Sequence, residues 1–129
     1  MLKNDLEDRL VQFAVMVLQL TDQLPNSKTG SQLSSRLIKS SSAASLNYAR
    51  AQSAESRKIF VRQLKTVLKF LRDTYAKLKM IDDQNLLPDS DLLAESLKEA
   101  DELIAIFVTS VRTATQNDAL AKKLKGIRK

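Results

Sequence analysis

A row of positive charges on one helix face is the clearest group of residues that could do chemistry. Lys and Arg recur at steps of three and four, which places five cations on one side of a helix: Lys58, Arg62, Lys65, Lys69 and Arg72. Clustered cations bind phosphates, and each phosphate that they neutralise adds to the salt dependence of binding. This basic stripe indicates RNA or another nucleic acid as one candidate partner, helped by Arg36, Lys39 and Arg50 on the preceding helix. A solvated face is the commoner explanation, and the chain has no Trp for base stacking.

Two groups of carboxylates could in principle hold a cation. Glu95, Glu99 and Glu102 share one helix face, and four aspartates lie around Pro88, namely Asp82, Asp83, Asp89 and Asp91. The aspartates lack the glycine and the ligand spacing of an EF-hand loop. Solubility and favourable charge near a helix N-terminus explain these acids more simply. We therefore expect no metal site and no cofactor.

The absence of His and Cys excludes most catalytic sites. Without them the chain has no thiol nucleophile, no Ser-His relay, no Cys/His zinc site and no disulfide. Six small residues follow Lys39, but no base could activate their serines, so we interpret them as a packing surface. The sequence predicts a protein that is not an enzyme and has no catalytic residues.

The location is expected to be cytoplasmic and away from membranes. The lack of Cys is compatible with a reducing compartment. No apolar run approaches the ~20 residues that span a bilayer, and the N-terminus is too acidic and interrupted for a signal peptide. The basic C-terminal segment has no aromatic anchor, and we interpret it as a solvated tail.

Apolar residues at helical spacing predict four helices. We expect them over about 5–24, 29–51, 54–80 and 91–117, with Asn4, Thr29, Ser53 and either Asp89 or Ser90 as their caps. The predicted core is Leu10, Phe13, Val17, Leu37, Tyr48, Leu64, Val67, Leu71, Leu97, Ile104 and Phe107. Short loops around Pro25 and Pro88 favour an all-α, up-down-up-down antiparallel four-helix bundle over residues 1–117. The basic tail, 118–129, would continue as a frayed helix or be disordered.

Charge is strongly segregated along the chain. Residues 28–79 carry twelve basic groups against two acidic ones, residues 80–118 carry nine acidic against two basic, and residues 119–129 carry five basic groups. Such asymmetry can steer anionic partners, or let subunits pair an acidic face with a basic one.

Most of the chain resembles a known family. The segments LPNSKTGSQL, SLNYARAQSAESRK and ELIAIFVTSVRTA, together with DLEDRLVQFAV near the start, resemble the four-helix-bundle proteins named for the 23S ribosomal RNA intervening sequence. The resemblance implies a left-handed bundle that assembles into a homopentameric ring, with no known enzymatic activity. A related accessory protein of diversity-generating retroelements binds nucleic acid and a reverse transcriptase, so RNA binding is an analogy at the family level only.

Three positions depart from that pattern. Similar proteins usually carry an acid where this chain has Arg50, Ile59 and Phe70. Ile59 and Phe70 are three helical turns apart and share one face with Gln63 and Thr66. We call these four residues the outer strip. An apolar strip at a normally charged place usually marks an interface, although the same side chains could instead enlarge the core or the ring contact.

These observations favour a non-enzymatic, self-associating scaffold. The expected assembly is a homopentamer whose outer strip, with Arg50 beside it, docks a second protein. Clustered polar-to-apolar changes on one helix are also what a redesigned assembly subunit would show, so that component can be natural or designed. The alternative is an RNA-binding or other nucleic-acid-binding protein that uses the basic stripe.

Overall fold

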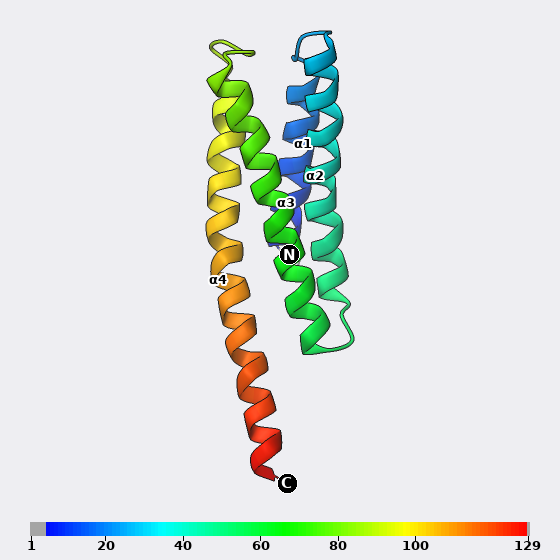
Figure 1. The fold of residues 1–129 in the computed structure, drawn as a ribbon, viewed down its shortest axis with the longest axis vertical. Coiled ribbons are helices and arrows are strands. Elements are labelled where there is room, and N and C mark those ends of the chain that lie inside the picture. Colours follow the sequence, from blue (N-terminus) through cyan, green and yellow to red (C-terminus); the bar gives the residue numbers. More distant parts are fainter. Residues whose placement is uncertain (1–4, 129) are drawn as a thin grey trace.

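The chain folds as four helices that pack side by side (Figure 1). The computed structural model describes residues 5–128, with the side chains of residues 5–126. The helices are α1 (Asp5–Thr21), α2 (Lys28–Gln52), α3 (Arg57–Asp83) and α4 (Asp91–Arg128). Each helix contacts the next one along the chain and α4 also contacts α1, so the bundle closes. No strand occurs between residues 5 and 128. The predicted all-α four-helix bundle is confirmed.

Serine side chains begin three of the helices. The Ser27 hydroxyl accepts the N–H of Gly30 at 3.1 Å, and the Ser56 hydroxyl accepts the N–H of Ile59 at 3.2 Å. The prediction that Thr29 opens the second helix is therefore wrong, and Ser53 instead ends α2 as its C-cap. Ser90 is confirmed, because its hydroxyl accepts the N–H of Leu93 at 3.1 Å. The predicted cap Asn4 lies outside the described residues.

The core contains the predicted residues of α1, α2 and α3, but on α4 two buried positions are shifted by one residue from the predicted ones. Nine of the predicted core side chains are buried, namely Leu10, Phe13, Val17, Leu37, Tyr48, Leu64, Val67, Leu71 and Phe107. Leu97 and Ile104 are only half-buried at the edge of the core, and Ser96 and Leu103 take the central positions on α4. The Tyr48 and Phe107 rings meet edge to face across the bundle, with 5.5 Å between their centroids.

The small residues of α2 let α3 approach closely. Ser40, Ser41 and Ala44 are buried, and the Ser40 hydroxyl lies 2.7 Å from that of Thr74 on α3. The Ser41 hydroxyl donates to the Leu37 carbonyl at 2.8 Å. Within the described residues no buried side-chain nitrogen or oxygen lacks a hydrogen-bond partner. The interpretation of this run as a packing surface agrees with these contacts.

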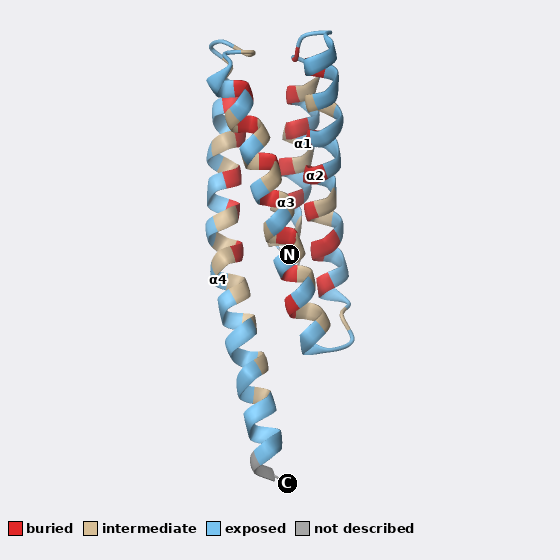
Figure 2. Ribbon diagram, in the orientation of Figure 1, coloured by how far each residue is buried: buried red, intermediate tan, exposed pale blue. Residues whose placement is uncertain are grey.

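The last helix is longer than the bundle. At ~1.5 Å per residue its 38 residues span roughly 57 Å, whereas the 17 residues of α1 span only about 25 Å. Figure 1 shows the C-terminal part of α4 projecting past the ends of the other helices. From Thr115 onward no described side chain of α4 is buried (Figure 2). We call residues 115–128 the α4 extension.

Candidate interaction surfaces

The basic stripe lies entirely on the outer surface of α3. Lys58, Arg62, Lys65, Lys69 and Arg72 are all exposed, and none of them forms an ion pair with a described residue. Three of them, Lys58, Arg62 and Lys65, line a shallow depression against Thr115 and Asp118 of α4. The first three cations of the stripe therefore lie beside the start of the α4 extension, and all five present positive charge to solvent.

The further cations of α2 are also exposed, but on the other flank of α3. Arg36 and Lys39 line a second shallow depression together with Phe70, Asp73 and Lys77. The ammonium group of Lys69 lies 5.4 Å from the centre of the Phe70 ring, within the range of a cation–π contact. Arg50 is exposed near the end of α2.

The outer strip is half-buried rather than fully exposed. Ile59, Gln63, Thr66 and Phe70 each keep part of their surface in contact with solvent. Phe70 packs against the hydrophobic core, whereas Ile59 is not part of that cluster. The Thr66 hydroxyl donates to the Arg62 carbonyl at 3.0 Å, so its hydrogen-bonding capacity is used within α3. The two apolar ends of the strip thus differ in whether they pack against the core.

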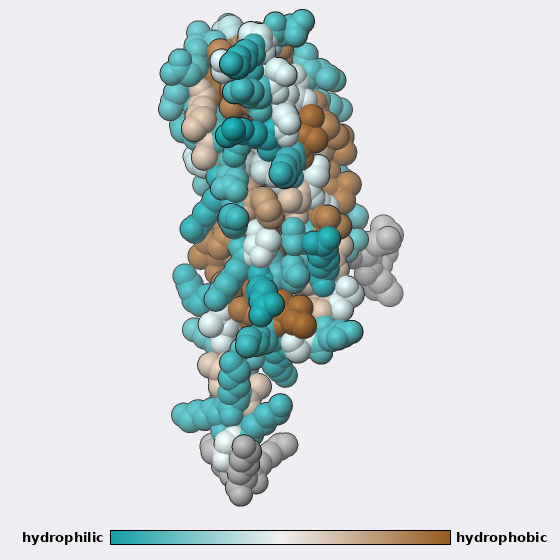
Figure 3. Space-filling view, turned by 45° about the vertical axis from the view of Figure 1, so that its right-hand side comes forward, coloured by the Kyte–Doolittle hydropathy of each residue, from teal (hydrophilic) through white to brown (hydrophobic). Residues whose placement is uncertain are grey.

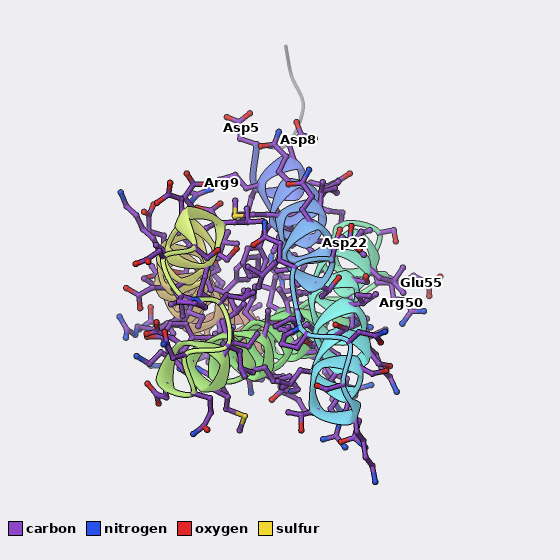
Figure 4. The ribbon with its side chains drawn as sticks, turned by 90° about the horizontal axis from the view of Figure 1, so that it is seen from above. Asp5, Asp8, Arg9, Asp22, Arg50 and Glu55 are labelled. Atoms are coloured by element: carbon purple, nitrogen blue, oxygen red, sulfur yellow. The ribbon has the colours of Figure 1, made fainter. Side chains whose placement is uncertain are left out.

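The glutamates of α4 pair with Arg9 of α1. The Arg9 guanidinium donates to both Glu99 oxygens, at 3.0 and 2.7 Å, and to Glu102 at 3.3 Å. Figure 4 shows Arg9 on the side of α1 that faces α4. The hydrogen bond that Arg9 donates to Glu99 raises the pKa of Arg9 above its ordinary value, despite partial desolvation, so the guanidinium stays charged. These acids join two helices, and no group of three described Asp or Glu side chains is placed to hold a metal ion.

The structure shows an exposed apolar face on α1 that was not predicted from the sequence. Val11, Val15 and Leu18 are 47%, 46% and 43% exposed, and Leu46 of α2 is 52% exposed. They line a groove whose remaining residues are mostly small: Glu7, Ala14, Ser42, Ser45 and Ala49. Figure 3 shows apolar surface along the right-hand edge of the upper molecule, where α1 and α2 lie. We call this feature the α1–α2 groove.

The sequence contains the signal for this groove, in the form of a second periodic face. Asp8, Val11, Val15, Leu18 and Asp22 recur at steps of three and four, on the side of α1 away from the core. The core face of α1 has the same period and larger side chains, so it dominates the pattern. An amphipathic surface helix usually has a polar outer face, whereas α1 exposes Val11, Val15 and Leu18 there.

The α4 extension carries exposed leucines of its own. Leu120 and Leu124 are 55% and 49% exposed and lie one turn apart on one face. The cations Lys122, Lys123 and Lys125 flank them, and Lys122 pairs with Asp118 at 3.4 Å. Within residues 5–128 no helix is long and apolar enough to cross a bilayer.

Comparison with known proteins shows the fold but not the family. No family model matches the chain. No curated protein matches it either. A solved structure that is similar to it is a protein of unknown function from the S23 ribosomal protein family of Bacteroides thetaiotaomicron VPI-5482. The TM-score is 0.74 at 20% sequence identity, over 82% of this chain and 97% of that one.

Proposed function

We propose that this chain is a non-enzymatic scaffold that associates with copies of itself and docks a second protein through the outer strip. The observation that carries self-association is the apolar face of α1, where Val11, Val15 and Leu18 each leave more than two-fifths of their surface in solvent. Contiguous apolar surface of this kind on a small domain usually marks a contact with another molecule. The family resemblance favours five subunits.

The outer strip supports docking of a second component at a separate place. Ile59 and Phe70 lie at its two ends, and both retain exposed apolar surface between exposed cations. A hydrophobic centre with a charged rim is typical of interfaces between proteins that also exist apart. The second protein would therefore present an apolar ridge with acidic neighbours.

A charge placed on the outer strip tests this docking. Ile59→Asp is the sharper variant, because Ile59 is outside the core cluster and lies in the first turn of α3, where an acid favours the helix. Native mass spectrometry of the wild type from its producing cells should show a mass that is not a multiple of the 14.5 kDa chain. The variant should keep its helical circular dichroism and leave only the homo-oligomer.

The matched control places acids outside the strip, at the exposed residues Gln52 and Ala76. Gln52→Asp with Ala76→Glu should change nothing in the larger assembly. Adding Phe70→Glu to Ile59→Asp should abolish docking, although it also lowers stability because Phe70 contacts the core. If the larger assembly survives Ile59→Asp with Phe70→Glu, docking at the strip is contradicted. If Ile59→Asp alone unfolds the chain, the strip belongs to the core instead.

Nucleic-acid binding is the second candidate, favoured by the exposure of all five cations of the basic stripe without ion-pair partners. If the stripe binds RNA, affinity for a single strand should fall with salt, by a log–log slope of about −0.7 for each contacted phosphate. Lys65→Glu with Lys69→Glu should then abolish binding. Lys28→Glu with Lys98→Glu makes the same charge change elsewhere and should weaken binding only slightly. No binding by the wild type at ~50 mM salt would leave the stripe as a solvated face.

A further inference from the structure

We infer that the α1–α2 groove receives the α4 extension of a second copy of this chain. This inference rests on the proposed self-association and names the two surfaces that carry it. Each subunit would insert its extension into one neighbour and receive an extension from another. Such a head-to-tail contact uses two different patches, and it generates a ring when the rotation closes.

The groove has the shape of a seat for one helix. Ala14, Ser42, Ser45 and Ala49 give it a floor of small side chains between the two helix axes. Small residues allow another helix to approach closely, while Val11 and Leu46 provide apolar walls. From Val11 to Leu18 the groove follows about two helical turns, roughly 10 Å. Leu120 and Leu124 span one turn, so both leucines fit within this length.

The α4 extension needs a partner that its own subunit does not supply. It continues α4 past the lower ends of the other helices and away from α1, which lies in the upper part of the molecule (Figure 1). Leu120 and Leu124 lie outside the hydrophobic core cluster of their own subunit, and about half of each remains in solvent. Docking in a second copy would cover both leucines together with Ala121.

Charge complementarity favours this occupant over others. Asp8 and Asp22 lie at the two ends of the apolar row on α1, and both are exposed. Seen from above, Asp5 and Asp8 lie together beside α1, Asp22 lies where α1 and α2 meet, and Glu55 lies next to Arg50 at the side of α2 (Figure 4). The extension offers Lys122, Lys123 and Lys125 around its leucines. An acidic rim around an apolar groove thus matches a basic rim around an apolar ridge.

The same charges disfavour two other contacts between copies. If two grooves packed face to face in opposite directions, Asp8 of one copy would lie opposite Asp22 of the other, which is unfavourable. The outer strip is a poorer occupant, because Phe70 already packs against its own core, whereas Leu120 and Leu124 lie outside that core and are about half exposed.

Two variants and their mixture test the contact by analytical ultracentrifugation. The tail variant carries Leu120→Gln and Leu124→Gln, and the groove variant carries Val15→Lys and Leu18→Lys. All four positions are exposed in the subunit, so helical circular dichroism should be unchanged. Each variant should raise the dissociation constant at least about 100-fold, since the burial of each of its two apolar side chains accounts for about tenfold or more. Met80→Gln, at an apolar residue equally exposed on α3, is the control and should assemble as the wild type does.

The mixture distinguishes a head-to-tail contact from every other arrangement. The tail variant keeps an intact groove and the groove variant an intact extension, so together they should form a complex of two chains and nothing larger. An assembled wild type whose tail variant still assembles overturns the inference while the proposed self-association stands. A mixture that stays monomeric also overturns it. A wild type that is monomeric at every concentration contradicts both the inference and the proposed self-association.

Discussion

At the scale of single residues, a hydroxyl pair inside the core fixes how α2 meets α3. Ser40 is 5% and Thr74 0% exposed, and their hydroxyls lie 2.7 Å apart. The Thr74 hydroxyl also donates to the Phe70 carbonyl at 2.8 Å, which leaves the Ser40 hydroxyl to donate to Thr74. A buried pair of this kind contributes little while intact and costs more when one partner is removed.

Thr74→Val should therefore destabilise the bundle more than its size change implies. The variant keeps the shape of the side chain but leaves the Ser40 hydroxyl with only a long contact to the Leu37 carbonyl, at 3.4 Å. We expect Thr74→Val to lower the free energy of unfolding by about 1–2 kcal/mol. The double variant Ser40→Ala with Thr74→Val should lose less than the sum of the losses of the two single variants. Urea unfolding of the four proteins measures the coupling, and strictly additive losses would show that the two hydroxyls do not interact.

The residue scale also shows where sequence periodicity reaches its limit. Leu64, Val67 and Leu71 are central in the core as predicted, because cations occupy the opposite side of α3. On α4 the structure buries Ser96 and Leu103 in place of Leu97 and Ile104. The Ser96 hydroxyl donates to the Leu92 carbonyl at 2.7 Å, so Ser96 packs as a small residue. Composition alone ranks a leucine above a serine and cannot foresee this local hydrogen bond.

At the scale of elements, the turn between α1 and α2 depends on one glycine. Gly30 is buried, and a Cβ atom there would collide with the carbonyl oxygen of Pro25. The Ser27 hydroxyl that caps α2 binds the Gly30 N–H in the same turn. The structure thus combines a cap, a proline and a close backbone approach within six residues, 25–30. Several serines and threonines could cap this helix by sequence, and the hydrogen bond from the Gly30 N–H to Ser27 places the start of the helix before Thr29.

Gly30→Ala should lower stability although Ala favours helices by about 1 kcal/mol. The collision is with backbone rather than with a movable side chain, so we expect a net loss of roughly 1–3 kcal/mol. Gly126→Ala is the matched control, because nothing lies within 4 Å of a Cβ atom there and the residue is outside the bundle. Thermal unfolding should show a lower midpoint for Gly30→Ala only. Equal midpoints for the two variants would mean that the turn relaxes without cost.

At the scale of the whole molecule, the fold could be predicted from the sequence more fully than the apolar surfaces that the fold leaves exposed. Four periodic segments separated by loops at Pro25 and Pro88 are sufficient to specify a four-helix bundle. The boundary predicted at residue 117 rests on the charge of the last segment, and α4 continues helically through Arg128 without an interruption there. The division into a bundle and a tail stays a prediction. Which apolar faces remain uncovered depends on how α1 and α2 pack, and periodicity does not contain that information.

The mass of the wild-type protein in solution tests the central claim, self-association, most directly. An exposed apolar groove, an unpartnered basic extension and a chain of segregated charge all favour assembly. Multi-angle light scattering at micromolar concentration should give a whole multiple of the 14.5 kDa chain mass, with five copies favoured by the family resemblance. A mass of 14.5 kDa that does not change with protein concentration would contradict the claim.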